Sequence, residues 1–161
     1  KESLYRSLVQ PAIDGFCELL QSVLYQFNRL SGEEQTRQML RRSNDEFPKV
    51  VDYLYDHFDE FKLLFTSGEN NAYQEFIHRV VELDTGCTAQ YIEASGNDAV
   101  SSGRLTPELN HLLSSAFYTG MFEVVIHNMP KEQAMKHIQK MRRFYTAGWQ
   151  TIFSSDGGED C

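Results

Sequence analysis

The sequence lacks the short motifs that mark many enzymes and cofactor-binding proteins. It has no glycine-rich phosphate loop, no CxxC pair of cysteines and no HExxH metal motif. No two histidines are four residues apart, so a metal site would need ligands from different helices. Carboxylates such as Asp14, Glu18 and Glu75 show no pattern of the kind that paired acid–base catalysis requires. We therefore expect no catalytic residues, no metal and no cofactor.

Cysteines, basic residues and long apolar runs are also scarce. The three cysteines, Cys17, Cys87 and Cys161, are odd in number and far apart, which indicates a reducing cytoplasm and not a disulfide framework. The chain has 15 Lys and Arg against 23 Asp and Glu, which gives a net charge of −8. An acidic chain of this kind is poorly suited to bind the phosphate backbone of a nucleic acid by itself. No apolar run approaches the ~20 residues that span a bilayer, so we expect no membrane partner.

Alternating strand patterns are missing as well, while apolar residues at helical spacing fill most of the chain. This combination predicts an all-α fold. A length of 161 residues suits a single domain that buries a real core. We expect that domain to cover residues 1–153, and we expect the glycine- and acid-rich residues 154–161 to form a flexible tail.

The same spacing predicts the individual helices. Pro11 should kink or restart the first helix, because proline removes a backbone donor and clashes with the preceding turn. Residues 48–65 form one amphipathic helix with Pro48 in its first turn. Residues 71–94 form another helix, and residues 95–103 form a flexible loop.

The chain closes with two long apolar patterns, in residues 106–128 and residues 131–153. Pro107 stands at the favoured first helical position of the first pattern. Apolar residues recur at steps of three and four in both, and small residues among them let helices approach closely. These stripes exceed what one small core requires, so we expect a homodimer. The expected interface residues are Leu109, Leu113, Ala116, Phe117, Gly120, Val124, Ile138, Met141, Tyr145, Gly148 and Ile152.

Residues 116–123 (AFYTGMFE) and 144–153 (FYTAGWQTIF) resemble the two closing helices of TetR-family transcriptional regulators. Residues 1–5 (KESLY) are similar to the segment where that family's DNA-binding domain ends and the first long helix of the regulatory domain begins. The resemblance covers nearly the whole chain as a diffuse pattern. It implies a TetR-like regulatory domain whose closing helices form a four-helix bundle across a two-fold axis.

The resemblance also implies a function. The chain would be the effector-sensing and dimerisation domain of a bacterial repressor in the cytoplasm. A helix-turn-helix of ~50 residues would precede residue 1 and would alone bind operator DNA. A small-molecule effector would change the spacing of the two DNA-binding heads through the first long helix. We expect no specific duplex binding by these 161 residues alone.

Aromatic residues at helical spacing indicate where an effector would bind. Aromatic stripes at this spacing usually fill a core, and we expect most of these residues to do so. Large rings that pack at awkward angles, together with a kink at Pro11, favour a cavity among them for a mid-sized, largely hydrophobic molecule. Asp84 and Thr88 lie among apolar neighbours and would supply polar contacts, with an inward Asp84 favouring a cationic ligand. The alternative is that helical drift carries both to the edge of the buried face. The expected lining is Phe16, Leu20, Tyr55, Phe58, Phe61, Phe65, Phe76, Val80, Asp84, Thr88 and Phe122.

Two other functions are also compatible with the sequence. A helical-bundle metal- or cofactor-binding protein, or an enzyme of that kind, would need Glu-x-x-His pairs on facing helices. Glu75 and His78 have this spacing, and so do Glu108 and His111. A helical bundle that serves only as an interaction module, without any ligand, is the third interpretation.

Overall fold

The computed structural model describes residues 2–38, 42–67 and 71–155, and their only regular secondary structure is α-helix. This confirms the expected all-α class. None of the helices in the described part is long and apolar enough to cross a membrane. The helices are α1 (Glu2–Asn28), α2 (Gly32–Gln38), α3 (Arg42–Asp56), α4 (Phe58–Thr66), α5 (Ala72–Ser95), α6 (Pro107–Ile126) and α7 (Lys131–Phe153).

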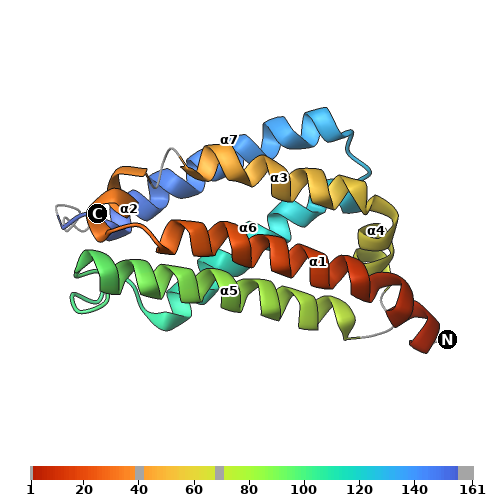
Figure 1. Cartoon of the computed structure of the whole chain (residues 1–161), viewed down its shortest axis with the longest axis horizontal. Coiled ribbons are helices and arrows are strands. Elements are labelled where there is room, and N and C mark those ends of the chain that lie inside the picture. Colours follow the sequence, from red (N-terminus) through yellow and green to blue (C-terminus); the bar gives the residue numbers. More distant parts are fainter. Residues whose placement is uncertain (1, 39–41, 68–70, 156–161) are drawn as a thin grey trace, which may run out of the picture.

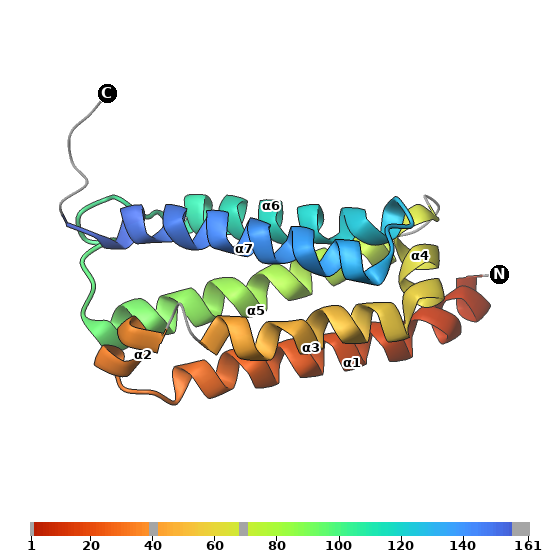
Figure 2. The same ribbon diagram turned by 90° about the horizontal axis from the view of Figure 1, so that it is seen from above.

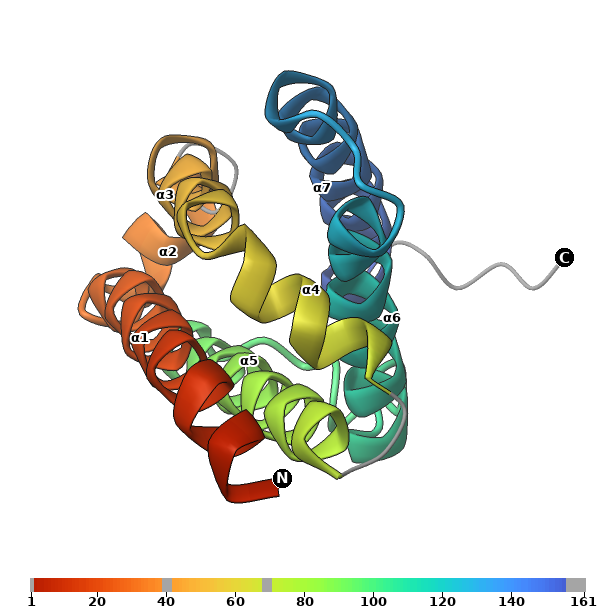
Figure 3. The same ribbon diagram turned by 90° about the vertical axis from the view of Figure 1, so that its right-hand side faces the viewer.

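The five long helices form a closed ring. In order around the ring, α1 contacts α3, α3 contacts α7, α7 contacts α6, α6 contacts α5, and α5 returns to α1. Figure 2 shows α6 and α7 as one layer and α1 and α3 as the opposite layer, with α5 between them. The short helix α4 crosses the ring near the N-terminal end of α1, as the end-on view of Figure 3 shows. It contacts α1, α3, α5 and α6, so one end of the ring is filled.

Aromatic rings form the core where α4 crosses. Phe16 of α1 packs edge-on against Phe61, Phe76 and Phe122, with ring centroids 5.7, 5.4 and 5.8 Å away. All four side chains are fully buried. Phe65 stacks on Phe122 at 4.8 Å and closes the cluster. Edge-to-face and offset contacts at these distances are the favoured geometries of aromatic pairs. The cluster therefore joins α1, α4, α5 and α6 into a tightly packed unit.

The closing helices begin where the sequence predicts. The Thr106 side chain caps α6 by accepting a hydrogen bond from the Leu109 amide at 3.1 Å, and Pro107 is the first helical residue. Residues of α3 and α4 stabilise the connection between α6 and α7. The Tyr55 hydroxyl donates to the Met129 carbonyl at 2.6 Å, and the Lys62 ammonium donates to the Ile126 carbonyl at 2.5 Å. A cation at carbonyls that end a helix is stabilising.

Two expectations about the helices were wrong, and a third was wrong in part. Helix α1 runs as one helix through Pro11, so the expected restart does not occur. Helix α3 begins at Arg42, which places Pro48 inside it and lets the buried Phe47 pack on Phe117. Residues 48–65 are not one helix, because the chain turns at His57. That turn directs α4 across the ring, a tertiary requirement that a continuous apolar stripe does not reveal.

The connection between α5 and α6 is anchored, in contrast to the expected flexible loop. Gly96 ends α5 in the left-handed conformation, with φ of 67°, where glycine is favoured. The Asn97 side chain donates to the Phe153 carbonyl and Arg104 donates to the Ile152 carbonyl, each at 2.9 Å. The connection thereby caps the end of α7. The expected flexible tail lies mostly outside the described residues, which end at residue 155.

Candidate ligand cavity

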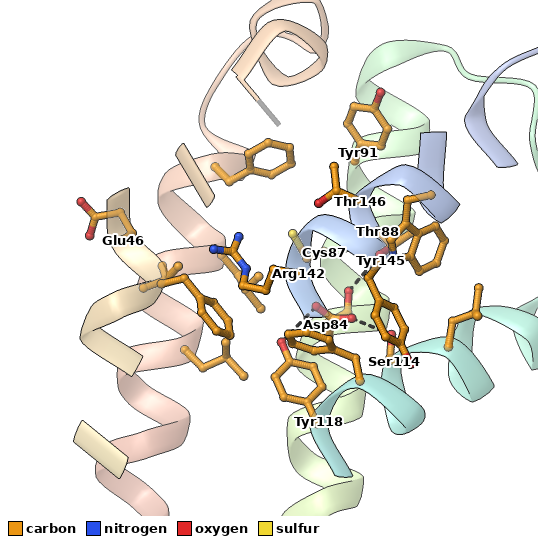
Figure 4. A pocket seen from close by; sticks show the side chains of 18 of the residues that line it. Glu46, Asp84, Cys87, Thr88, Tyr91, Ser114, Tyr118, Arg142, Tyr145 and Thr146 are labelled. Atoms are coloured by element: carbon orange, nitrogen blue, oxygen red, sulfur yellow. Dashed lines mark hydrogen bonds between the residues drawn. The ribbon is translucent and has the colours of Figure 1, made fainter. Parts of the chain in front are cut away.

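A cavity of about 230 Å³ lies inside the helix ring, at the end that α4 does not fill. All five long helices contribute to its wall, and Figure 4 shows their side chains converging on it. Most of the wall is aromatic or aliphatic, with a few polar groups, which is the usual composition of a small-molecule site. The lining residues are Leu20, Val23, Leu24, Gln26, Phe27, Glu46, Phe47, Asp84, Cys87, Thr88, Tyr91, Leu113, Ser114, Phe117, Tyr118, Arg142, Tyr145, Thr146, Trp149 and Phe153.

Asp84 is held in the wall between α5 and α6. Its two carboxylate oxygens accept hydrogen bonds from the Ser114 hydroxyl at 2.5 Å and from the Tyr118 hydroxyl at 3.1 Å (Figure 4). Burial raises the pKa of the Asp84 carboxyl above its ordinary value, and these two hydrogen bonds oppose that rise. Burial also raises the pKa of the Tyr118 hydroxyl well above its ordinary value. The group is a polar network in an apolar surrounding, which explains how a half-buried Asp is accommodated.

Arg142 brings a cation to the wall from α7. Its guanidinium carbon lies 4.2 Å from the centre of the Phe47 ring, a cation–π contact that joins α7 to α3. Burial lowers the pKa of the Arg142 guanidinium to about 10, so the group remains a cation at neutral pH. In Figure 4 the guanidinium extends from α7 toward α1 and α3. A positive charge therefore lies within a largely apolar wall.

Cys87 is the one thiol among the lining residues, and burial favours its protonated form. Burial raises the pKa of the Cys87 thiol to about 12, and the thiol donates a hydrogen bond to the Asn28 side chain at 3.4 Å. Because the thiolate is the reactive form, such a thiol does not act as a nucleophile at neutral pH. The second described free cysteine, Cys17, is buried with its pKa raised to about 11. Neither cysteine supports covalent chemistry in the cavity.

The structure brings together only some of the residues expected to bind an effector. Leu20, Asp84 and Thr88 line the cavity. Thr88 also donates its hydroxyl proton to the Asp84 carbonyl at 3.2 Å. The remaining expected residues lie outside this cavity, in or against the packed aromatic core. They are Phe16, Phe61, Phe76, Val80 and Phe122, which are buried, and Tyr55, Phe58 and Phe65, which pack on them.

Sequence reasoning missed the wall that α7 provides. Arg142, Thr146 and Trp149 all face the cavity, whereas the pattern of α7 was interpreted only as a dimer seam. A signal was present, because steps of three and four from Ile138 place Arg142, Tyr145 and Trp149 on one side of the helix. An arginine within an otherwise apolar stripe is the kind of residue that marks a site.

The expected dimer residues divide between two environments. Phe117, Val124 and Ile138 are buried within the protomer, and Leu113 and Tyr145 line the cavity. A Cβ on Gly120 would meet the Met141 side chain at 3.0 Å, so that close approach occurs within one chain. Ala116 and Gly148 are exposed, and Leu109 and Ile152 are half-buried. Two large apolar side chains outside the expected set are the most exposed on this pair, Leu112 at 63% and Phe144 at 75%.

The residues of the cofactor alternative do not converge. Glu75 is exposed and pairs with Arg6 at 3.2 Å, and His78 is exposed and pairs with Glu82 at 3.1 Å. Glu108 and His111 are exposed at the start of α6. Within the described part of the chain, no group of three or more His, Cys, Asp and Glu side chains is placed to hold a metal ion. The cavity wall is therefore the site with the strongest claim to a ligand.

Comparison with known proteins adds no family to this description. No family model matches the chain, and no curated protein or solved structure matches it either.

Proposed function

We propose that this chain is the effector-sensing and dimerisation domain of a TetR-family repressor in the cytoplasm. A small, largely apolar molecule enters the cavity, and a DNA-binding helix-turn-helix joined to the start of α1 responds to it. One observation carries the proposal: a cavity of about 230 Å³ is bounded by all five long helices, with aromatic walls and a few buried polar groups.

Helix α1 provides a physical route from the cavity to the DNA-binding part. It is one uninterrupted helix of 27 residues, which corresponds to about 40 Å at the helical rise. Its second half lines the cavity with Leu20, Leu24 and Phe27, and its other end is the N-terminal end of the chain (Figure 1). A ligand that binds one position of α1 more tightly than another shifts the population toward that position. The far end of the helix would then move with it.

The outer face of α6 and α7 supports dimerisation. Figure 2 shows these two helices as a layer whose outer side faces away from the rest of the protomer. Leu112, Ala116, Phe144 and Gly148 are exposed there. A Cβ on Gly148 would meet nothing within 4 Å in the protomer, so this glycine leaves room for another helix to approach. Pairing with a second copy across a two-fold axis would form a four-helix bundle and bury this apolar surface.

A ligand screen with a blocked cavity tests the sensing function. Small apolar and amphiphilic molecules should raise the melting temperature of the wild-type chain, because a ligand that binds only the folded state stabilises it. Thr88→Phe places a ring in the cavity and should abolish the shift. Ala89→Phe adds the same ring at an exposed neighbouring position on α5 and should leave the shift unchanged.

Two results would contradict the proposal. If no molecule in a broad screen raises the melting temperature, or if Thr88→Phe responds as the wild type does, the cavity is not a sensing site. The regulatory part of the proposal has its own test in the coding sequence directly upstream of Lys1. A helix-turn-helix of ~50 residues is expected there, and a different domain in that place would remove the TetR assignment.

A further inference from the structure

Several polar groups that line the cavity gather around Asp84, on the wall that α5 and α6 form. The Ser114 and Tyr118 hydroxyls each donate their proton to its carboxylate, at 2.5 and 3.1 Å (Figure 4). The Thr88 hydroxyl donates to the Asp84 main-chain carbonyl at 3.2 Å. A hydroxyl has one proton and two lone pairs, so these three hydroxyls can offer a ligand only lone pairs. We call Asp84, Thr88, Ser114 and Tyr118 the acceptor cluster.

Asp84 is the member of the acceptor cluster that is best placed to meet a ligand. It lines the cavity and is partly exposed, whereas Ser114 and Tyr118 each expose only 2% of their surface. A carboxylate can accept about four hydrogen bonds. The two hydroxyls provide two of them, so lone pairs of the Asp84 oxygens remain for a ligand. A ligand group with an O–H or N–H bond matches these lone pairs.

The other end of the cavity is aromatic. Tyr91 follows Asp84 by two turns of α5, which is about 10 Å along the helix. The Tyr91 ring packs on Phe27 and Phe153, with ring centroids 6.1 and 5.1 Å away. Trp149 stacks on Phe153 at 5.5 Å, and all four rings line the cavity. The cavity therefore has one polar end and one aromatic end.

The charges of the wall favour a ligand without charge. Asp84 supplies a carboxylate, and Arg142 supplies a guanidinium from α7. The positive charge of Arg142 acts on Tyr118, where it opposes the rise that burial causes in the pKa of the hydroxyl. A cation at the acceptor cluster would lie in this positive field, and an anion would be repelled by the Asp84 carboxylate. A neutral group that donates a hydrogen bond avoids both costs.

The volume of the cavity limits the size of the molecule. An apolar cavity of about 150 Å³ holds one benzene molecule. By that measure, about 230 Å³ accommodates roughly a dozen non-hydrogen atoms. A single substituted benzene ring fits this limit.

We propose that the cavity binds an uncharged aromatic alcohol, such as an alkylphenol, whose hydroxyl donates a hydrogen bond to the Asp84 carboxylate. The apolar end of the molecule would lie against Tyr91, Trp149 and Phe153. This inference rests on the proposed ligand-sensing function and names its ligand class. It differs from the expectation from sequence that an inward Asp84 would favour a cationic ligand.

Four ligands that differ only in the head group test the proposal. They are 4-propylphenol, 4-propyltoluene, 4-propylbenzylamine and 4-propylbenzoate. Trp149 is the only tryptophan of the chain and lines the cavity, so its fluorescence reports binding to the whole chain. The titrations are made at about pH 8, where a phenol with a pKa near 10 is uncharged.

The phenol should bind most tightly of the four. A methyl group has about the size of a hydroxyl but donates no hydrogen bond. The phenol should therefore bind about ten- to a hundred-fold more tightly than 4-propyltoluene, the range for a hydrogen bond to a charged group. Both charged compounds should bind more weakly than the phenol.

Variants then assign the preference to one residue. Asp84→Asn keeps the shape of the side chain and replaces one carboxylate oxygen by a donor, so the phenol should bind within about threefold of 4-propyltoluene. Glu82→Gln makes the same change at an exposed position of α5 and should retain the full preference. If Asp84→Asn does not fold, nuclear Overhauser effects in the wild type locate the ligand. The ring protons beside the phenol hydroxyl should then contact the Tyr118 ring.

Every other outcome contradicts the inference in a distinct way. Equal binding of 4-propylphenol and 4-propyltoluene would remove the hydrogen-bond donor from the ligand class and leave the sensing function standing. Tightest binding of the amine or of the benzoate would show that the cavity selects a charge. A phenol preference that survives in Asp84→Asn, or a hydroxyl end distant from Tyr118, would exclude Asp84 as the acceptor.

Absence of binding by all four compounds at their solubility limits would also contradict the inference. The screen with Thr88→Phe would then decide separately whether the sensing function fails as well.

Discussion

The phenolic oxygen of Tyr53 lies only 2.0 Å from the position that a Cβ on Gly15 would occupy. Tyr53 reaches from α3 across α1 and donates its hydroxyl proton to the Ala12 carbonyl at 3.2 Å. Its ring also packs edge-on against Phe16 and Phe61. The glycine in the middle of α1 therefore makes room for a tyrosine from the next long helix of the ring.

Gly15→Ala should destabilise the protein, although Ala is favoured over Gly in a helix by roughly 1 kcal/mol. The new methyl group would displace the Tyr53 ring and disturb its packing on Phe16. Gly86→Ala is the matched control on α5, where a Cβ would meet nothing within 4 Å, and it should stabilise the protein by up to ~1 kcal/mol. Urea unfolding measures both. Equal stabilisation by the two substitutions would show that the contact at Gly15 has no energetic weight.

Phe61→Ala should lower the free energy of unfolding by ~3–5 kcal/mol, the range for a large aromatic side chain removed from a packed core. Phe61 is fully buried, contacts the rings of Phe16 and Phe76, and lies outside the ligand cavity. Leu63→Ala, on the same helix with 37% of its surface exposed, should cost much less. A loss below ~1.5 kcal/mol for Phe61→Ala would mean that α4 contributes little to the core.

Stability should depend on pH through Asp84 in an unusual direction. The folded-state pKa of its carboxyl is raised above 3.8 by burial, so the folded protein holds this proton more tightly than the unfolded chain does. The stabilisation is complete below about pH 3.8 and is lost as the pH rises through the folded-state pKa. Relative to Asp84→Asn, which does not titrate, the wild type should therefore lose stability as the pH rises from 3.8. Urea unfolding at a series of pH values measures the difference.

Asp14→Asn is the control for that experiment. The difference in stability between wild type and this variant should change with pH in the opposite direction. The Asp14 carboxylate accepts a hydrogen bond from Arg79 at 2.7 Å, which lowers the pKa of its carboxyl in the folded protein. Its contribution is present above pH 3.8 and is lost as the pH falls through the lowered folded-state pKa. The effect is small, since both partners are exposed. Parallel slopes for the two variants would contradict the assignment of Asp84.

The proposed dimer should depend on Phe144, whose side chain is 75% exposed in the protomer. Light scattering after size exclusion should give twice the chain mass for wild type and a single chain mass for Phe144→Glu, because a charge would be buried at the interface. A substitution at Gly120 would be a poorer test of the interface, because a Cβ there would meet the Met141 side chain of the same chain at 3.0 Å. Leu4→Glu, at a residue 66% exposed on α1, should remain dimeric. A monomeric wild type at tens of micromolar would remove the proposal.

Local patterns were sufficient to predict the closing helices α6 and α7, but not the break between α3 and α4. Thr106, Pro107 and Pro130 mark helix starts through their own backbone chemistry, and the structure confirms the boundaries of α6 and α7 within two residues or so. The turn at His57 has no such marker, because the apolar stripe continues through it. Its cause is a contact distant in sequence, the insertion of Phe61 beneath Phe16.

The candidate site was predicted in part for the same reason. Asp84 and Thr88 stand out because polar residues interrupt an apolar face, and both line the cavity. The aromatic residues expected beside them follow the same helical spacing whether they fill a core or line a cavity, so spacing could not separate Phe61 from Phe117. The position of α4 separates core residues from cavity-lining residues. This helix fills one end of the ring and leaves a cavity at the other end, which Arg142 lines.

Contacts with other elements anchor both ends of helix α7. Lys131 pairs with Asp52 at 2.8 Å beside its first turn, and Asn97 and Arg104 bind its final carbonyls. Arg142, Tyr145, Thr146 and Trp149, which line the cavity, lie between these attachments. A helix that is held at both ends is expected to bend, and not to shift along its axis, when a ligand pushes against its middle. A molecule that fills the cavity would therefore change the curvature of α7, and Phe144 lies on the outer side of that span.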